Sequence, residues 1–229
     1  MKAKVNGPVT VTDYVTRSIR ERILSGTYPP GTKLDQQMLV EEFGASLIPV
    51  RESLRQLEAQ GFVRLYPHKG AYVAELSLAE VKEIYFVREL LEAAAARLAV
   101  PRLSTEDKER LAHYLAHMES ATASGDYARL LEVNRDFHFV IYEASGNQLL
   151  VELIRSLWDR SSRYRHLYTY LPDRAPRALA EHKRIYRLCL SGDAEAAGRA
   201  VGNNVRQTVR GLIPVLRARL VEDDVVQSS

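Results

Sequence analysis

The sequence predicts a mainly α-helical protein with two domains: residues 1–76, which combine three helices with one β-hairpin, and residues 77–229, which form an all-helical bundle. Apolar residues recur at helical spacing along most of the chain, and Ser, Thr, Asp, Gly or Pro residues mark where each such segment begins and ends. A β-hairpin pattern occurs in one place, on both sides of a Pro/Gly turn at residues 67–70. With 46% hydrophobic and 27% charged residues, the chain can form ordinary hydrophobic cores.

Charge and cysteine content narrow the class of protein. The net charge is +3, and the first 76 residues hold ten Lys and Arg against eight Asp and Glu, which permits a nucleic-acid partner without requiring one. Cys189 is the one cysteine of the sequence, so no internal disulfide can form. No segment resembles a signal peptide or has membrane-spanning length. We therefore expect a cytoplasmic protein with no membrane partner.

Three helices are expected in the first domain. The first covers about residues 12–25 and is followed by a turn at residues 28–31. The second is short, begins at the capping residue Asp35 and stops at Gly44. The third begins at Ser46. Two helices joined by a tight turn that contains Gly are typical of a helix-turn-helix.

The third helix carries the residues that point to a function. We expect Ser46 to cap its first turn, which contains Pro49, and Gly61 to end it. Arg51 and Arg55 lie one turn apart on one face. The apolar residues that face the other way, at helical spacing, are Val50, Leu54, Leu57 and Phe62. A cationic face suits the DNA major groove, where Arg binds guanine or phosphate; the alternative is a solvated helix face.

The hairpin completes this domain. Residues 62–66 and 71–74 are β-prone and flank the turn, whose tip carries His68 and Lys69. We expect this tip to enter the DNA groove beside the third helix. The first domain is thus predicted to be a winged helix-turn-helix.

Several motifs of this domain closely resemble the DNA-binding domain of GntR-superfamily bacterial repressors. They are Ile23-Leu24-Ser25-Gly26, Pro30-Gly31, Pro49-Val50-Arg51-Glu52-Ser53-Leu54, Leu57-Glu58, Gly61-Phe62-Val63 and residues 67–73. The resemblance implies that Arg51 reads bases and Ser46 contacts a phosphate. It also implies a wing tip formed by His68, Lys69 and Gly70.

The chain departs from the family pattern directly after Ser46. The family commonly has Arg followed by Thr or Ser there, and this chain has Leu47 and Ile48. Either the operator differs, or Leu47 makes an apolar contact, for example with a thymine methyl group. We place Leu47 and Ile48 in the predicted DNA-binding set, together with Arg55 and with Gln37 of the preceding helix.

Six helices are expected in the second domain, over about residues 78–100, 104–123, 125–145, 147–170, 176–190 and from 192 onward. Ser77 and Glu80 form a predicted capping box before the first of them. We expect the last helix to be interrupted at Gly211 and Pro214 and the tail after Leu220 to fray.

Polar residues fall inside or beside the apolar stripes of four of these helices. They are Tyr85, Arg88 and Glu92 in the first helix, Asn134, His138 and Tyr142 in the third, His182 in the fifth and Asn204 in the sixth. Buried polar groups need partners. We therefore expect the helices to share an internal cavity that holds a ligand, with or without a metal ion.

Two other groups are expected on the surface. His113 and His117 have a spacing that would suit a metal ion, but they lie opposite the apolar residues of their helix. A cationic cluster near the end of the fourth helix is expected to be solvated rather than a second nucleic-acid surface; it contains Arg155, Arg160, Arg163, Arg165 and His166.

The second domain resembles the FCD effector-binding domain of one GntR subfamily, over most of residues 78–215. The matching motifs are Arg88-x-x-Leu91-Glu92, Phe137-His138, Ser145-Gly146-Asn147-Gln148-Leu149, Glu181-His182 and Gly192-Asp193. In that family one Asp or Asn and three His commonly hold a divalent metal beside a carboxylate effector. By position, His138 and His182 match two of the histidines, Asn134 stands where the Asp often is, and Asn204 stands where the third His is.

The resemblance therefore implies a site for a metal of the Zn, Ni or Mn class, weakened by its two Asn residues, or a cavity without metal. We predict a transcriptional regulator and not an enzyme. It would be a homodimeric repressor on a pseudo-palindromic operator in double-stranded DNA. A small carboxylate effector would be held by Arg88, with Tyr85, Glu92 and Tyr142. Two alternatives stay open: a metal-dependent hydrolase or oxygenase using His138 and His182, and a helical dimerisation scaffold without ligand.

Overall fold

A computed structural model describes the backbone of residues 10–169 and 174–227 and the side chains of residues 10–164 and 174–220. The chain divides into two compact units, Met1–Leu76 and Ser77–Ser229, and each is described by itself. Nine α-helices and a three-stranded sheet make up most of the described residues, so the prediction of a mainly helical protein is confirmed. None of the helices in these ranges is both long and apolar enough to cross a membrane.

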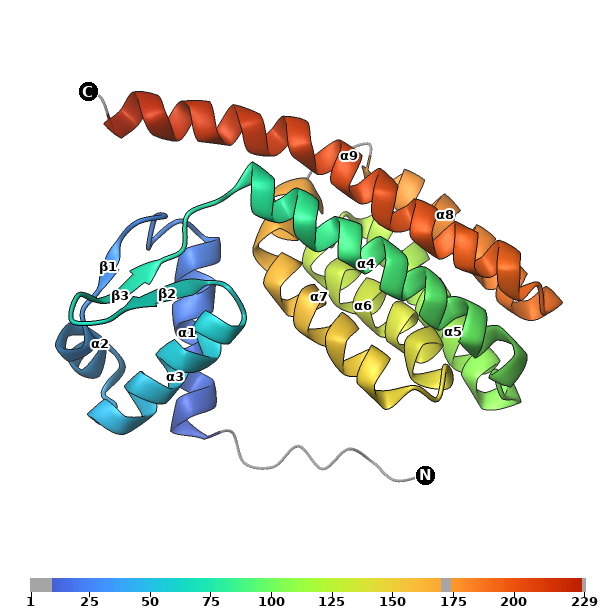
Figure 1. Ribbon diagram of the computed structural model, residues 1–229, viewed down its shortest axis with the longest axis horizontal. Helices are drawn as coiled ribbons and strands as arrows, with labels where there is room; N and C mark the ends of the chain where they lie inside the picture. The colour runs from blue at the N-terminus through green and yellow to red at the C-terminus, as the bar shows by residue number, and fades with distance from the viewer. Residues whose placement is uncertain (1–9, 170–173, 228–229) are drawn as a thin grey trace. The chain divides into compact units, whose positions relative to one another are not determined.

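The first unit is a winged helix-turn-helix (Figure 1). Its elements are α1 (Val11–Leu24), β1 (Lys33–Leu34), α2 (Gln36–Phe43), α3 (Leu47–Ala59), β2 (Val63–Tyr66) and β3 (Gly70–Val73). The strands are antiparallel in the order β1-β3-β2, and β2 and β3 form the predicted hairpin. The two-residue strand β1 was not predicted, because it is too short to show alternation. The core is apolar and fully buried, and includes Val15, Ile19, Leu39, Val50 and Leu57.

Nearby residues cap α2 as predicted from the sequence, but the start of α3 differs from the prediction. The Asp35 carboxylate accepts hydrogen bonds from two backbone N–H groups of α2, at 2.9 and 3.1 Å, and Gly44 ends α2 in the left-handed conformation. Ser46 is the N-cap residue of α3, but its hydroxyl makes no capping bond. The prediction of a side-chain cap at Ser46 is therefore wrong. The third residue of α3 is Pro49, which lacks one of the N–H groups that such a cap would bind.

The second unit is all-helical. Its elements are α4 (Leu78–Ala99), a short 3₁₀ turn (Val100–Arg102), α5 (Thr105–Ser124), α6 (Tyr127–Ala144), α7 (Gln148–Thr169), α8 (Arg174–Ser191) and α9 (Ala194–Gln227). The predicted interruption of the last helix is wrong, because α9 continues through Gly211 and Pro214. The predicted fraying after Leu220 is also not seen, since the helix runs to Gln227. Pro214 lies on the exposed side of α9, while Leu212 and Leu216 are completely buried. The predicted helix end at Tyr170 lies outside the described residues.

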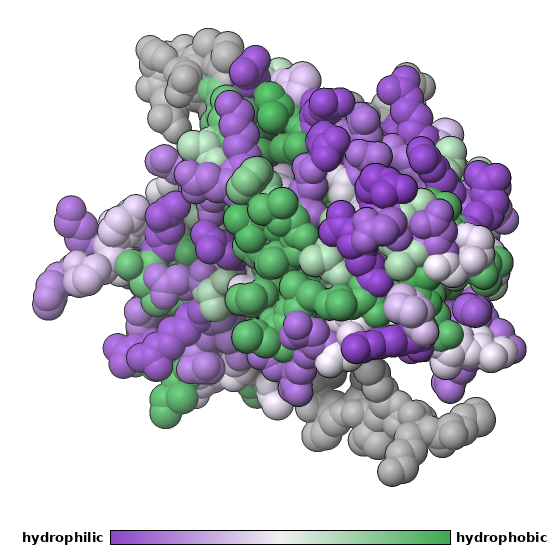
Figure 2. Space-filling view, turned by 45° about the vertical axis from the view of Figure 1, so that its right-hand side comes forward, coloured by the Kyte–Doolittle hydropathy of each residue, from purple (hydrophilic) through white to green (hydrophobic). Residues whose placement is uncertain are grey.

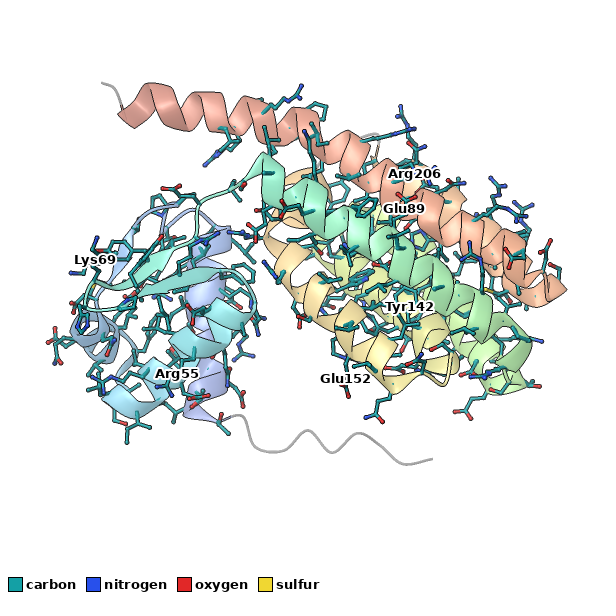
Figure 3. All side chains as sticks on the ribbon, viewed as in Figure 1. Arg55, Lys69, Glu89, Tyr142, Glu152 and Arg206 are labelled. Atoms are coloured by element: carbon teal, nitrogen blue, oxygen red, sulfur yellow. The ribbon has the colours of Figure 1, made fainter. Side chains whose placement is uncertain are left out.

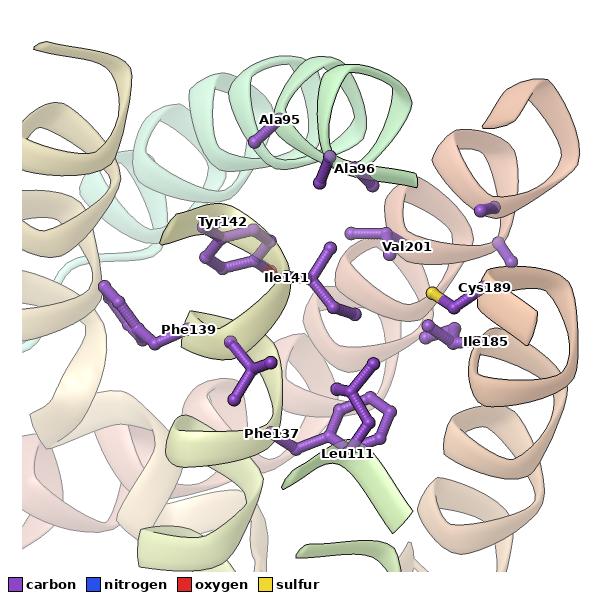
Figure 4. Close-up of a cluster of buried hydrophobic side chains, with 14 of the residues drawn as sticks. Ala95, Ala96, Leu111, Phe137, Phe139, Ile141, Tyr142, Ile185, Cys189 and Val201 are labelled. Carbon is purple, nitrogen blue, oxygen red and sulfur yellow. The ribbon is translucent and has the colours of Figure 1, made fainter. Parts of the chain in front are cut away.

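Helix α4 packs closely against α9. A side-chain carbon at Gly198 would lie 2.9 Å from the backbone oxygen of Ala93, closer than real contacts allow. A cluster of buried apolar side chains then fills the centre of the unit, including Leu111, Phe137, Ile141, Ile185, Cys189 and Val201 (Figure 4). The interior is therefore mostly hydrocarbon, with buried polar side chains beside it.

Candidate functional sites

Helix α3 presents a cationic face to solvent. Val50 and Leu54 are buried on one side of the helix, and Arg51 and Arg55 are exposed on the other. The Arg51 Nε donates a hydrogen bond of 2.9 Å to Gln36 Oε1, so α2 helps to position this arginine. Gln37, the residue predicted from this helix, is exposed, and the contact with Arg51 comes from its neighbour Gln36. In a helix of eight residues, the pattern alone could not decide which of two adjacent glutamines faces α3.

A concave surface of about 420 Å³ lies between α3 and the hairpin. It is lined by Gln36, Arg51, Leu54, Arg55, Leu65, Tyr66, His68 and Gly70. Lys69 is exposed at the hairpin tip, and Figure 3 shows it and Arg55 on the surface of this unit. Gly70 has φ +102° and His68 has φ +61°, so the tip is a tight turn that projects its side chains. The structure thus brings α3 and the predicted wing tip to one groove.

The first turn of α3 is apolar and exposed. Leu47 is 39% exposed and Ile48 is 80% exposed, the highest value among the large apolar residues of the described side chains. Ser46 is also exposed. All the predicted DNA-binding residues are therefore accessible, apart from the half-buried Gly70.

A cavity of about 60 Å³ lies within the second unit. Its walls come from six helices and include Arg88, Met118, Leu130, Leu131, Asn134, His138, Trp158, Arg174, Ala175, Ala178, Asn204, Val205 and Thr208. Four residues that the sequence placed in apolar stripes, Arg88, Asn134, His138 and Asn204, face this one space. His182 is buried and reaches it through His138.

Arg88 is already paired inside the protein. Only 3% of it is exposed, its Nε lies 2.6 Å from Glu92 Oε1, and its Nη1 donates to Ser161 Oγ at 2.9 Å. Its guanidinium also stacks 4.4 Å from the Trp158 ring centre. Burial alone would lower the pKa of Arg88, but the Glu92 carboxylate raises it above its ordinary value. The predicted pairing of Arg88 with an effector carboxylate would therefore compete with an internal ion pair.

Glu92 connects this ion pair to the predicted effector residues. Its Oε1 accepts a second bond from Trp158 Nε1 at 2.9 Å, and its Oε2 accepts from the Tyr142 hydroxyl. The same hydroxyl lies 3.1 Å from His138 Nδ1. Tyr85 is buried against Arg88, with its ring centre 4.9 Å from the guanidinium. Sequence reasoning missed Trp158 and Ser161, since both belong to α7, whose pattern does not show which neighbour its polar groups meet.

The two histidines complete a chain of polar contacts from α4 through α6 to α8. His138 Nε2 and His182 Nε2 lie 2.9 Å apart, and His182 Nδ1 lies 2.6 Å from the backbone oxygen of Ala178. A carbonyl oxygen only accepts, so His182 must carry its proton on Nδ1 and receive the bond from His138 on Nε2. Burial lowers the pKa of His182 to about 4, against a raising effect of the Ala178 carbonyl, so His182 is neutral at pH 7.

The donor set does not provide a complete metal site. Among the described residues, no three His, Cys, Asp or Glu side chains lie close enough to share a metal ion. Asn204 Nδ2 donates to Glu181 Oε2 at 2.6 Å, so that carboxylate is already engaged. The cavity is lined by two guanidinium groups and no carboxylate, a poor setting for a divalent cation. Metal binding by His138, His182, Asn134 and Asn204 stays a prediction.

One part of the predicted cationic surface is instead structural. Arg163 is only 5% exposed and binds the Glu80 carboxylate, which also accepts from the Tyr164 hydroxyl at 2.8 Å. The expectation that Arg163 is solvated is therefore wrong, because its guanidinium pairs with the Glu80 carboxylate of another helix. In the predicted capping box, the backbone N–H of Glu80 donates to Ser77 Oγ. Arg155 and Arg160 are exposed and form surface ion pairs. The side chains of Arg165 and His166 lie outside the described part of the chain.

The remaining histidine pair lies on α5. His113 is exposed and His117 is half-buried, and their ring centres lie 4.4 Å apart. They lie on the surface of α5, as expected, and are not among the residues that line the cavity.

Comparisons with known proteins identify the families of both units. Residues 12–73 match the bacterial regulatory proteins of the gntR family, and residues 83–207 match the FCD domain. The transcriptional regulator McbR of Escherichia coli K12 is 32% identical over 184 residues, covering 80% of this chain and 82% of McbR. LutR of Bacillus subtilis 168 is 32% identical over 213 residues, covering 82% of this chain and 96% of LutR.

A solved structure, that of E. coli McbR/YncC, superposes with a TM-score of 0.74 at 28% identity, covering 89% of this chain and 97% of that one. The relatives are named as transcriptional regulators, which confirms the prediction that this chain is not an enzyme. The chain belongs to the GntR family of bacterial regulatory proteins and is a transcriptional regulator of the type that carries an FCD domain.

Proposed function

We propose that this regulator is a homodimeric repressor that binds a pseudo-palindromic operator through α3 and the hairpin tip, in the cytoplasm. The observation that carries this proposal is the groove between α3 and the hairpin, where Arg51, Arg55 and His68 converge. Cationic side chains bind phosphate or guanine there, and two copies related by a twofold axis would contact two half-sites. Repression is supported by two relatives from E. coli K12 named as repressors, RspR and GlaR.

An apolar surface of the second unit supports the homodimer. Phe86 and Leu90 on α4 are 65% and 56% exposed, and Leu149 and Leu153 on α7 are 67% and 48% exposed. Helices α4 and α7 pack side by side, and Figure 2 shows apolar surface gathered on one face of the molecule. Exposed apolar patches usually mark an interface. We assign this one to a second copy of the chain, because an isologous contact pairs the same surface with itself.

The cavity supports a small carboxylate as effector. A cavity volume of about 60 Å³ leaves room only for a small ligand. Arg88 and Arg174 supply positive charge at the wall, and Asn134, Asn204 and Thr208 supply hydrogen bonds. A carboxylate that draws Arg88 away from Glu92 would change the contacts between α4 and α7. Such a ligand would shift the population of helix arrangements and hence operator affinity.

One experiment separates this proposal from its rivals. Operators are selected from random duplexes with the full chain, and small mono- and dicarboxylates are then screened for release of the DNA and for a rise in melting temperature. A sensor responds to at least one acid in both assays. No rise with any acid favours a dimerisation scaffold without ligand.

A further inference from the structure

The first turn of α3 exposes two apolar side chains where a DNA-reading helix needs recognition groups. Ile48 is 80% exposed and Leu47 is 39% exposed, whereas the apolar residues that follow them in the helix, Val50 and Leu54, are buried in the core. The fold therefore gains little from Ile48. Burial does not account for an isoleucine at this position.

Ile48 lies on the same face of α3 as the arginines. Arg51 and Arg55 follow it by three and seven residues, which places the three side chains along one stripe of the helix. The N-terminal residues of a recognition helix are those that contact base edges. Arg51 and Arg55 on the same stripe, which line the groove beside the hairpin, make a DNA duplex the fitting occupant of this apolar patch.

We propose that Ile48, together with Leu47, reads the C5-methyl group of thymine in the operator. This inference rests on the proposed function as a DNA-binding regulator. In the major groove, thymine alone presents a methyl group among the four bases, and an aliphatic side chain can distinguish bases there only by apolar contact. Leu47 and Ile48 have no side-chain donor or acceptor, so they cannot read guanine or adenine. The operator should accordingly hold thymine opposite the first turn of α3, flanked by bases or phosphates that Arg51 and Arg55 contact.

Deoxyuridine provides the test, because it pairs like thymidine and lacks only the methyl group. Each thymine in one half-site of the selected operator is replaced singly by deoxyuridine, and Kd is measured for the full chain. We expect one or two positions at which binding weakens about fourfold, the loss that corresponds to one buried methyl group. The Leu47→Ala, Ile48→Ala double variant should bind the thymine operator more weakly and should show no difference between thymine and deoxyuridine at those positions.

The controls separate this contact from folding and from the general function. Leu190→Ala truncates an apolar side chain that is 45% exposed on α8 and should leave the deoxyuridine profile unchanged. The double variant should melt within a degree or two of the parent, since both of its sites are exposed. If no deoxyuridine weakens binding, or if the double variant keeps the same penalty, the thymine contact is overturned while the DNA-binding function stands. If the parent protein binds no duplex at all, the proposed function fails as well.

Discussion

His138 on α6 and His182 on α8 share a buried hydrogen bond, with 2.9 Å between their Nε2 atoms and 1% exposure of each residue. His182 holds its own proton toward the Ala178 carbonyl, so the bond between the rings needs a proton supplied by His138. The pair lies at the end of a chain that begins at the Arg88–Glu92 ion pair. Hydrogen bonds thereby connect side chains at the cavity wall across α4, α6 and α8.

The neutral state of His182 predicts a loss of stability in acid. Its pKa is lowered from 6.5 to about 4 in the folded protein, so the unfolded chain binds a proton below about pH 6.5 while the folded chain does not. The free energy of unfolding should therefore fall as pH decreases from 6.5 to 4, by up to about 3 kcal/mol from this residue. Urea denaturation of the parent and of His182→Gln, followed across this pH range, measures the contribution. The variant should be less stable at pH 7 and should show a shallower decline.

His113→Gln is the matched control for the acid experiment, because His113 is an exposed histidine of the same unit. Its decline between pH 6.5 and 4 should parallel that of the parent. An equal slope for the parent and for His182→Gln would show that the buried histidine does not stay neutral.

Burial predicts that replacing Glu92 lowers the stability of the fold far more than replacing Glu89 on the same helix. Glu92 is fully buried against Arg88, whereas the half-buried Glu89 pairs with the exposed Arg206 on α9 (Figure 3). Glu92→Gln would leave the Arg88 charge buried with a neutral partner, at a cost of about 3–5 kcal/mol. Glu89→Gln should change the melting temperature little, because solvent screens its pair. Comparable losses in the two variants would contradict the internal ion pair.

The cavity chemistry predicts that a metal site can be created by two substitutions. Asn134→Asp with Asn204→His would add a carboxylate and an imidazole to the existing pair of histidines, a set suited to Zn²⁺. We expect the double variant to bind about one equivalent of Zn²⁺ by elemental analysis and to melt at a higher temperature with the metal. The parent should bind far less under the same conditions. Stoichiometric metal in the parent, lost on His138→Ala, would show that the Asn residues suffice.

The fold could be read from the sequence where its cause is local. Asp35 caps α2 and Gly44 ends it because a carboxylate next to free N–H groups and a residue with positive φ act within one turn. The continuity of α9 could not be read this way. Pro214 signals a break locally, but the burial of Leu212 and Leu216 against other helices keeps the helix intact.

The same distinction holds for the sites. The stripe positions of Arg88, His138 and His182 showed that these side chains face inward, since periodicity reveals which side of a helix is buried. Periodicity does not reveal which groups meet across helices. The pairing of Arg88 with Glu92, the bond between the two histidines and the role of Trp158 therefore became visible only in the structure.

The exposed position of Arg51 predicts that its removal weakens operator binding without lowering the stability of the fold. Its side chain is exposed at the groove and held by Gln36, so Arg51→Ala should weaken operator binding by about 1–3 kcal/mol and leave the melting temperature unchanged. Gln36→Ala should produce a smaller loss, because it removes only the group that positions the arginine. Arg199→Ala, an exposed arginine on α9, is the control and should not affect binding. Unchanged affinity for Arg51→Ala would remove α3 from the recognition role.

The apolar surface of α4 predicts how the protein assembles. Phe86 and Leu90 are 65% and 56% exposed, so glutamate at both positions should leave the fold of one chain intact while placing like charges across the twofold interface. Analytical ultracentrifugation should find a dimer for the parent and a monomer for Phe86→Glu, Leu90→Glu. The monomer should also bind a full operator more weakly than the dimer, because linking two half-site contacts adds an effective-concentration advantage. Leu190→Glu, on α8, should remain dimeric. A dimeric Phe86→Glu, Leu90→Glu variant would mean that a different surface joins the two copies.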